Sequence, residues 1–386
     1  MSGYLAEADL SANRIELARR RAARRGYIDL TSSNPTHQAL LFPSDILREA
    51  AEQYWSRRRY DPDPRGLLPA RQAIVRYYAE RRAPACEHDP ERVVITASTS
   101  EAYSLLFALL CAPGDNVLAP DIAYPLFEHL AAIHHVELRP YRLIEQHDWQ
   151  IDPDSLWIQA DRRTRAVLVV SPHNPTGMVV CERQPIFDEL DLPIVCDEVF
   201  AEFTYRVARV PFLADLHPDL PVFTLNGISK MLALPDLKLG WIMLSPRAAA
   251  QYAGRLEILN DMMLGANTLT QTMLPTLLER GLPFLEHMRQ RVRASLDYAI
   301  RKLSGCQRLH VTPPDGGYYL FPRVLECSDE EALVIDLLEA GVLVHPGYFY
   351  GAQVERGVGH VMISCLTRQE DLAAGIDVLC RALSNP

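Results

Sequence analysis

Five short apolar runs, each separated from the next by a helical stretch, most constrain how this chain can fold. They cover residues 93–96, 116–119, 166–170, 194–196 and 222–225. Nearly continuous apolar runs of this length are typical of strands buried on both faces, and their alternation with helices favours parallel pairing. We therefore predict an α/β fold with a mainly parallel sheet flanked by helices.

The length of the chain and the pattern of its last third predict a second, smaller unit. A chain of 386 residues is too long for one simple core, so two domains are expected. The last third mixes helices with strands that look antiparallel, which indicates an α+β domain. We place the large domain at residues 48–275 and form the small domain from residues 1–47 and 276–386.

Further elements are predicted from helical periodicity, turn residues and short apolar runs. The helices are expected over residues 13–25, 43–58, 69–82, 101–111 and 329–340 and from about 369, and the strands over 27–30, 240–244, 315–321 and 361–364.

Charge and hydropathy exclude two classes of partner. The net charge of −10 argues against a nucleic-acid surface, and the one basic run, residues 19–25, lacks interleaved aromatic residues. No apolar run is long enough to cross a bilayer, and residues 1–7 lack the basic start and apolar core of a signal peptide. We expect a cytoplasmic protein that binds neither nucleic acid nor membrane.

The cysteines give no sign of a disulfide framework or a metal site. All eight are scattered, without a CxxC pair, and several lie inside apolar runs. We therefore expect reduced thiols and no bound metal.

Polar residues follow the predicted strands, and the carboxyl ends of parallel strands are where α/β proteins bind ligands. Ser98, Thr99 and Ser100 come directly after the first strand and open a helix. Free N–H groups and hydroxyls at a helix start suit a phosphate, although the same residues also cap ordinary helices.

The next strand ends carry an aromatic ring, an amide and a carboxylate. Tyr124 is expected either to pack in the core or to offer a stacking surface, and Asn174 is presented by a loop that two prolines and a glycine fix. Asp197 lies at the end of the fourth strand, where a buried carboxylate needs a cationic partner.

Lys230 lies in residues 225–231, which we interpret as a loop that begins where the strand over residues 221–224 ends. A lysine held in a partly dry pocket loses its charge more easily, and the neutral amine can condense with a carbonyl. A second basic residue, Lys238, follows eight positions later.

The order of these motifs resembles the class I/II aminotransferase family of fold-type I pyridoxal-phosphate enzymes. The motifs are the hydroxyl cluster at a helix start, the Pro-x-x-x-Tyr-Pro segment, the Ser-Pro-x-Asn-Pro-Thr-Gly loop, the Asp-Glu strand end and the Ser-Lys pair. Asn174 precedes Asp197 by 23 residues, and Asp197 precedes Lys230 by 33. The resemblance runs from about Ser33 to the C-terminus.

The resemblance assigns roles around pyridoxal 5′-phosphate. It implies that Lys230 holds the cofactor as an internal aldimine and later moves the proton of the substrate. It implies that Asp197 pairs with the protonated pyridine nitrogen, which satisfies the buried carboxylate. Tyr124 would stack on the ring, and Asn174 would donate to the ring oxygen.

The phosphate and the quaternary structure follow from the same resemblance. Ser98, Thr99 and Ser100 would bind the phosphate, with Ser229 and Lys238 nearby. Tyr60 lies in the proline-rich loop over residues 60–66 and would reach the phosphate of a neighbouring subunit, which implies a homodimer with shared sites. The implied substrates are an amino donor, which is an amino acid or a related amine, and a 2-oxo acid.

Four positions depart from the family pattern. Gly227 replaces a phosphate-binding serine, Lys238 replaces an arginine and so loses the bidentate fork, and Phe200 replaces a tyrosine that donates to the ring oxygen. Met362 stands where most members have the arginine that binds the substrate carboxylate, and a thioether cannot bind a carboxylate.

The departure at Met362 leaves two possibilities open. Either another cation binds the carboxylate, with Arg368 and Arg65 as candidates, or the substrate is not a standard α-amino acid. Ser33 and Asn34 are further candidates for the substrate pocket.

Two alternatives to the aminotransferase remain on sequence alone. The same scaffold supports a β-eliminating C–S lyase, and the change at Met362 makes a non-catalytic protein that binds pyridoxal phosphate conceivable. Retention of Lys230, Asp197 and Asn174 weighs against the second alternative.

Overall fold

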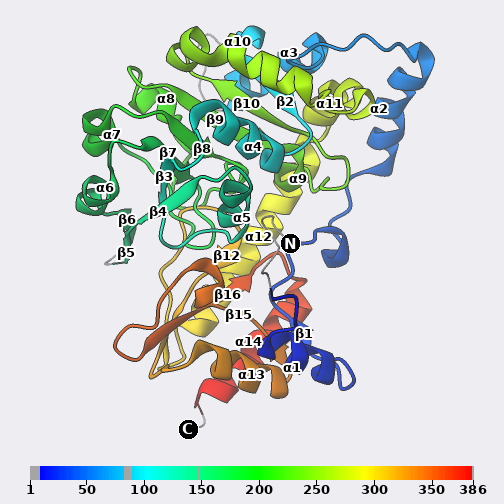
Figure 1. Ribbon diagram of the computed structural model, residues 1–386. Coiled ribbons are helices and arrows are strands. Elements are labelled where there is room, and N and C mark those ends of the chain that lie inside the picture. The colour runs from blue at the N-terminus through cyan, green and yellow to red at the C-terminus, as the bar shows by residue number, and fades with distance from the viewer. Residues whose placement is uncertain (1–8, 82–88, 146–147, 385–386) are drawn as a thin grey trace.

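The computed structural model describes residues 9–81, 89–145 and 148–384, which form a larger and a smaller part (Figure 1). Two expectations from the sequence, that residues 1–7 form no signal peptide and that Cys86 is a reduced thiol, concern residues outside the described ranges. None of the seven described cysteines is in a disulfide bond with another described residue. The domain boundaries at 47/48 and 275/276 stay a prediction.

The larger part is built on one seven-stranded sheet, which contains all five apolar runs and the strand predicted over residues 240–244. In spatial order the strands are β2 (Val93–Thr96), β10 (Gly240–Leu244), β9 (Val222–Gly227), β8 (Ile194–Asp197), β7 (Thr164–Val170), β3 (Asn116–Pro120) and β4 (Glu137–Tyr141). The pairs from β9 to β4 are parallel, and β10 alone is antiparallel to both of its neighbours. The predicted α/β fold with a mainly parallel sheet is confirmed.

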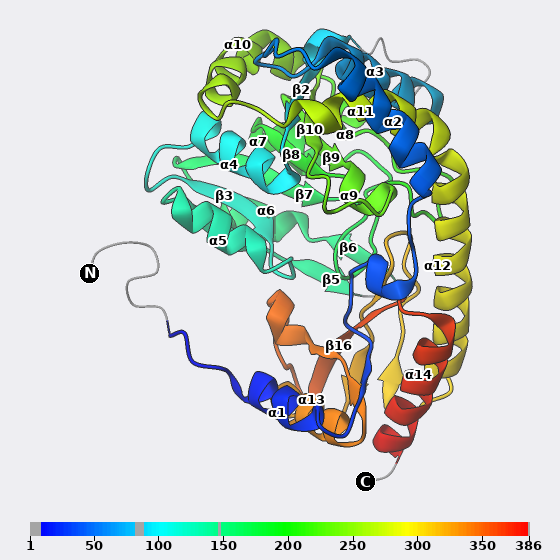
Figure 2. The same ribbon diagram turned by 90° about the vertical axis from the view of Figure 1, so that its right-hand side faces the viewer.

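Successive strand residues alternate between two hydrophobic cores, as a doubly covered sheet requires. In β2, for example, Val94 packs in one core and Val93 and Ile95 in the other. Figure 2 shows α4 (Thr99–Leu110) and α5 (Leu126–Ile133) on one side of the sheet and α2 (Ser44–Arg57) and α11 (Thr268–Arg280) on the other. The helices and turns of the larger part are α2 (Ser44–Arg57), α3 (Leu68–Arg81), η2 (Pro90–Arg92), α4 (Thr99–Leu110), α5 (Leu126–Ile133), α6 (Pro153–Gln159), α7 (Pro185–Leu190), α8 (Leu213–Leu216), α9 (Ile228–Met231), α10 (Pro246–Met262) and α11 (Thr268–Arg280).

The smaller part is α+β, as predicted, and centres on β16 (Val358–Ser364). Helix α12 (Leu282–Leu303) runs down one side of the molecule and joins the two parts (Figure 2). Strand β16 is antiparallel to its three partners, which are β12 (Tyr319–Leu320), β13 (Arg323–Leu325) and β15 (His345–Pro346). The remaining elements are α1 (Arg14–Ala22), β1 (Ile28–Asp29), η1 (Thr36–Gln38), the hairpin of β5 (Leu143–Glu145) and β6 (Trp149–Ile151), β11 (Leu309–His310), β12 (Tyr319–Leu320), β13 (Arg323–Leu325), α13 (Glu330–Glu339), β14 (Val342–Leu343), β15 (His345–Pro346), η3 (Gly347–Tyr350) and α14 (Gln369–Ser384).

The N-terminal segment is held in place by hydrogen bonds to the C-terminal strands. Strand β1 pairs in parallel with β14, and the carbonyl of Leu30 accepts the N–H of Ser364 at 2.7 Å. The Ser364 hydroxyl donates to the carbonyl of Ser32 at 2.8 Å. These bonds fix the residue that follows, Ser33, between the two parts.

Two predicted elements differ from the structure near the site. Lys230 is not in a loop, because β9 continues through Gly227, where it pairs with Gly240 of β10, and the one-turn helix α9 follows directly. The strand expected over residues 315–321 is confined to β12, because Gly317 takes φ +81° and turns the chain just before it.

Candidate active site

A cavity of about 300 Å³ lies at the carboxyl ends of the central strands, between the larger and the smaller part. This is where a parallel sheet is expected to bind its ligand. Of the predicted site residues, its lining brings together Ser33, Ser98, Thr99, Ser100, Tyr124, Asn174, Asp197, Ser229, Lys230 and Lys238.

Asp197 ends β8 at the floor of this cavity and is 5% exposed. Its carboxylate accepts the phenol O–H of Tyr103 at 2.8 Å and the N–H of Val199 at 3.0 Å. Burial raises the pKa of the Asp197 carboxyl, while these two hydrogen bonds and the nearby charge of Lys230 act in the opposite direction. The carboxylate is thus oriented and partly neutralised, and it can still accept a cationic N–H from the cavity.

Tyr103 is a site residue that the sequence analysis missed. It lies four residues after Thr99 on α4, so both side chains lie on one helix face. Burial raises the pKa of Tyr103 well above its usual value, which keeps the phenol protonated as a donor to Asp197. The spacing from Thr99 was the one available clue, and it does not reveal a contact with β8.

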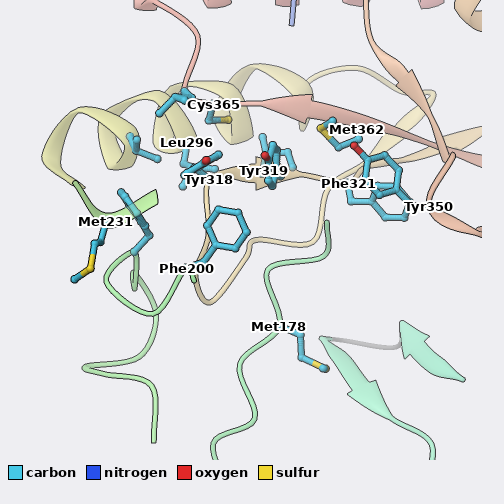
Figure 3. Close-up of a cluster of buried hydrophobic side chains, with 14 of the residues drawn as sticks. Met178, Phe200, Met231, Leu296, Tyr318, Tyr319, Phe321, Tyr350, Met362 and Cys365 are labelled. Carbon is cyan, nitrogen blue, oxygen red and sulfur yellow. The ribbon is translucent and has the colours of Figure 1, made fainter. Parts of the chain in front are cut away.

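Lys230 projects from α9 toward an aromatic cluster. Its Nζ lies 5.8 Å from the centroid of the Phe200 ring. Phe200 in turn contacts Tyr318 and Tyr319 edge-on, at centroid distances of 4.8 and 5.8 Å. Figure 3 shows the three rings close together. Tyr319 lines the cavity, and sequence reasoning did not single it out.

The helix start of α4 forms the opposite end of the cavity. Ser98 caps the helix, and its hydroxyl accepts the N–H of Glu101 at 3.1 Å. The N–H groups and hydroxyls of Thr99 and Ser100 are the ones that the helix leaves available for an anion. Lys238 and Ser229 line the same cavity and add a positive charge and a hydroxyl.

Gly240 allows this end of the cavity to form. A Cβ atom at Gly240 would lie 3.0 Å from both the carbonyl carbon of Ser98 and the nitrogen of Thr99. Strand β10 therefore approaches the first turn of α4 as closely as a glycine permits. A Cβ at Gly227 would likewise meet the carbonyl oxygen of Leu239 at 2.7 Å, which explains a glycine at this position.

Asn174 has an unsatisfied amide at the wall of the cavity. Its Oδ1 is buried without a hydrogen-bond partner. The adjacent His173 is buried, and its Nδ1 lies 2.9 Å from the hydroxyl of Thr176, which fixes the loop. A buried amide left unpaired is costly unless a ligand satisfies it.

Pyridoxal phosphate fits this set of groups. A buried carboxylate suits a protonated ring nitrogen, the Nδ2 group of Asn174 can donate to a ring oxygen, and an open helix start with Lys238 suits a phosphate. Lys230 supplies the amine between these groups.

Tyr124 lies at the mouth of the cavity and is 45% exposed, so it is not a core residue. Its ring meets Phe127 edge-on at 6.0 Å. The preceding Ala123 donates its N–H to the carbonyl of Tyr350 at 2.7 Å, so the smaller part holds this segment in place.

Four predicted residues do not line the cavity. Arg65 forms ion pairs with Glu257 and Glu91 at 2.7 and 3.1 Å, and Arg368 lies 3.4 Å from Asp371 at the surface. The remaining two are Asn34, whose amide oxygen is bonded to Thr36, and Tyr60, which is 75% exposed. Within one subunit, neither arginine replaces the carboxylate-binding arginine.

Among the described residues, none of the helices is long and apolar enough to span a membrane. No group of three or more histidine, cysteine, aspartate or glutamate side chains with the geometry to hold a metal ion occurs in residues 9–81, 89–145 and 148–384.

Comparison with protein families matches residues 25–379 to the family described as "Aminotransferase class I and II". Among curated proteins, a glutamate-pyruvate aminotransferase of Escherichia coli (strain K12) is 27% identical over 371 residues, which cover 92% of this chain and 90% of that protein. A tyrosine aminotransferase of Dictyostelium discoideum is 29% identical over 228 residues, or 56% of this chain. The match spans only 54% of the length of that relative.

Solved structures show the same fold. An alanine aminotransferase from Pyrococcus furiosus superposes with a TM-score of 0.89 at 25% identity, and the match covers 100% of both chains. An aspartate aminotransferase mutant of Thermus thermophilus has a TM-score of 0.83 at 21% identity, over 99% of both chains, and shows the fold alone.

Proposed function

The chain belongs to the aminotransferase class I and II family, and from this premise we propose that it is a pyridoxal-phosphate-dependent aminotransferase. The amino group would move from an amino acid or a related amine to a 2-oxo acid. The observation that carries the proposal is that Lys230, Asp197, Asn174 and the start of α4 face one cavity.

When bound, pyridoxal phosphate supplies an aldehyde that condenses with amines and a ring that withdraws electrons from the reacting carbon. Asp197, oriented by Tyr103, would hold the proton on the ring nitrogen. Thr99, Ser100, Ser229 and Lys238 would bind the phosphate, and Tyr124 would cover the ring from the mouth of the cavity.

Lys230 is the base that this cavity offers for moving the proton of the substrate. Burial raises the pKa of Tyr103 and of Tyr319, so both phenols stay protonated and serve as donors. Asp197 is already bound by Tyr103 and Val199. The substrate amine would first replace the amine of Lys230 on the cofactor. The freed amine of Lys230 would then take the proton from the substrate carbon and deliver it to the cofactor carbon that was the aldehyde carbon.

A homodimer is part of this proposal. The end of α10 and the turn after it expose Ile258, Met262, Met263 and Leu264 at 59%, 67%, 52% and 83%. The adjacent Asn260 donates to the carbonyl of Pro64, in the same loop as Tyr60. Contiguous exposed apolar side chains mark interaction surfaces, which supports a two-fold contact that brings Tyr60 to the partner's phosphate site.

The test is reduction of the purified holoenzyme with borohydride, followed by peptide mass analysis. We expect the peptide that contains Lys230 to gain the mass of the reduced cofactor, and a Lys230→Ala variant to show no such gain. An unmodified Lys230 peptide in protein that retains the cofactor would contradict the proposal.

Half-reactions separate the proposed aminotransferase from the two alternatives. An aminotransferase converts the cofactor to its amine form without releasing ammonia, whereas a β-eliminating lyase releases pyruvate and ammonia. A protein whose cofactor spectrum no amine changes would be a non-catalytic binder. The relatives reported above are named as aminotransferases, and none of the observations favours the lyase.

A further inference from the structure

The wall of the cavity opposite the phosphate end is formed by Ser33 and Tyr319, and Met362 lies behind it. Tyr319 of β12 pairs with Ser364 of β16, so the two side chains share a face of the sheet. Met362, two residues before Ser364, lies on that same face. It is 1% exposed and lies near the rings of Phe321 and Tyr350 (Figure 3).

The cations that line the cavity are both at the cofactor end. Among its lining residues only Lys230 and Lys238 are positively charged, and the proposed function commits Lys230 to the cofactor aldehyde and Lys238 to the phosphate. No lining residue is an arginine or a histidine. The substrate end therefore offers no cation of its own within one subunit.

The cations that lie behind this wall are engaged elsewhere. Arg323 Nε lies 3.1 Å from Glu145 Oε2, and His345 Nδ1 lies 3.1 Å from the phenol oxygen of Tyr350. Burial lowers the pKa of His345, which keeps that imidazole neutral. Arg291 has a buried and unpaired Nη2, but it does not line the cavity.

The groups that do face the substrate are neutral and polar. The hydroxyls of Ser33 and Tyr319 can each donate and accept a hydrogen bond. A carboxylate held in a half-enclosed site without a cation pays for lost hydration, whereas a hydroxyl or a carboxamide is satisfied by such partners.

We propose that the site prefers an amine whose reacting carbon carries a neutral group, such as hydrogen, alkyl, hydroxymethyl or carboxamide, instead of a free carboxylate. Ser33 and Tyr319 contact this group, and Met362 keeps the wall behind them uncharged. The inference rests on the proposed function. It narrows the donor from an amino acid to the related amine, and it replaces the 2-oxo acid acceptor by an aldehyde or a ketone without an adjacent carboxylate.

The transfer stays balanced for such substrates. The C–N bond of the donor is replaced by a C=O bond whose oxygen comes from water, and the nitrogen passes to the carbon of the acceptor, whose carbonyl oxygen leaves as water. The donor carbon is oxidised by two electrons and the acceptor carbon is reduced by two. Because the acceptor enters the same cavity, we expect an aldehyde or ketone to bind better than a 2-oxo acid.

The first test uses the wild-type holoenzyme and pairs of ligands that cannot react. Calorimetric titration compares propanamide with propionate and 3-phenylpropanamide with 3-phenylpropionate, so each pair differs only in the charged group. In whichever pair has a size that the cavity accommodates, we expect the amide to bind at least about tenfold more tightly than the carboxylate. A carboxylate that binds as tightly as its amide, or more tightly, would overturn the inference and point to Arg291, Arg368 or a cation of the partner subunit.

The second test changes the wall itself. In Met362→Arg, a guanidinium would be available to a carboxylate, and we expect the ratio of carboxylate to amide affinity to rise at least about tenfold. Met362→Leu is the matched neutral control and should leave the ratio unchanged. An unchanged ratio in a folded, cofactor-loaded Met362→Arg protein would overturn the role of Met362. If this variant does not fold, the comparison of amides with carboxylates in the wild-type protein decides the substrate class.

The two proposals fail in different ways. If no amine, amino acid or amino amide changes the absorbance of the cofactor, the proposed aminotransferase fails, whatever the amide and carboxylate affinities are. If amino acids convert the cofactor and carboxylates outcompete amides, the aminotransferase stands and the narrowed substrate class falls.

Discussion

His173 is a buried, neutral imidazole in the loop that carries Asn174. Its burial makes the stability of the fold sensitive to acid. It is 2% exposed, beside Asn174, and its ring bonds Thr176. Burial lowers the pKa of His173 from its usual 6.5 to about 3. Between these two pH values the unfolded chain binds a proton that the folded chain does not, so stability falls as the pH falls from 6.5 toward 3.

We therefore predict that His173→Gln flattens the acid side of the stability profile. At pH 4.5 the wild-type imidazole costs about 2 to 3 kcal/mol relative to pH 7, and a glutamine does not titrate. Melting temperatures of cofactor-free protein between pH 7 and pH 4.5 measure the effect. His310→Gln, at an exposed histidine, is the control, and an equal slope in wild type and His173→Gln would contradict the prediction.

Phe200 stands next to Lys230 where the family pattern has a tyrosine, so the cavity wall lacks one phenol. The lack of this phenol is expected to alter the pH titration of the cofactor. A tyrosine at this position would place an additional donor in the cavity, where a hydrogen bond to an anionic ring oxygen is worth about 1.5 kcal/mol or more. In Phe200→Tyr we expect the pH midpoint of the cofactor's absorbance change to fall by about one unit. A pH titration of visible absorbance checks it against Phe200→Leu, and equal midpoints in wild type and Phe200→Tyr would refute it.

The individual site residues differ in how far the sequence could place them. Lys230, Asp197 and Asn174 follow buried strands, so parallel pairing alone brings them to one edge of the sheet. Tyr103 and Tyr319 could not be predicted, because their roles depend on contacts between a helix and a strand, or between the two parts of the chain. Such contacts have no local pattern in the sequence.

At the scale of elements, the phosphate end depends on how closely β10 approaches the start of α4. The contact between Gly240 and the Ser98–Thr99 peptide leaves no room for a methyl group. Because the N–H groups of Thr99 and Ser100 must point into the cavity together, a small displacement of this turn weakens both anion contacts at once.

We predict that Gly240→Ala lowers the affinity for pyridoxal phosphate about tenfold, or about 1.4 kcal/mol, and also lowers the melting temperature. The matched control is Gly254→Ala, at an exposed site in α10 where a new Cβ meets no atom within 4 Å. That change should stabilise the protein by about 0.5 to 1 kcal/mol and leave the affinity unchanged. Titration of cofactor-free protein with pyridoxal phosphate measures the two affinities, and thermal melts measure the two stabilities. Equal affinities in the two variants would exclude this role of Gly240.

Strands formed by continuous apolar runs were predictable, whereas the edge strand β4 was not. The five apolar runs form β2, β3, β7, β8 and β9. A strand that is buried on both faces of a sheet needs apolar side chains at successive positions. Strand β4 lies at the sheet edge, where Glu137 is exposed, and therefore lacks that pattern. The six predicted helices were found within a few residues of their bounds, because caps such as Ser98 can extend a helix beyond its apolar stripe. Helices α10, α11 and α12 were not predicted.

At the scale of the whole molecule, the site is assembled from distant segments of the chain. Ser33 reaches the cavity through the bonds of Leu30 and Ser32 to Ser364, more than 300 residues later. Sequence patterning indicated a smaller α+β part but could not show that the N-terminal segment completes the cavity. Tyr60 lies outside the cavity lining within one subunit, so it could complete a site only in a neighbouring subunit.

The exposed turn after α10 provides the way to test a shared site. Leu264 is 83% exposed and also takes φ +62°, which is uncommon for a leucine. An apolar side chain held in a costly backbone conformation at the surface is difficult to explain without a partner. We predict that wild-type protein is a dimer and that the double variant Met262→Glu/Leu264→Asn is largely monomeric at micromolar concentration.

The monomer should also bind its cofactor less well, because the partner's Tyr60 no longer reaches the phosphate. One phenol hydrogen bond to a charged phosphate contributes about 1.5 to 3 kcal/mol, so a loss of tenfold or more in affinity is expected. Sedimentation equilibrium and cofactor titration on the same samples measure both effects. Ile158→Glu removes an equally exposed apolar side chain from α6 and should change neither. A monomer with full cofactor affinity would show that each subunit binds the phosphate alone, and a double variant that stays dimeric would place the interface elsewhere.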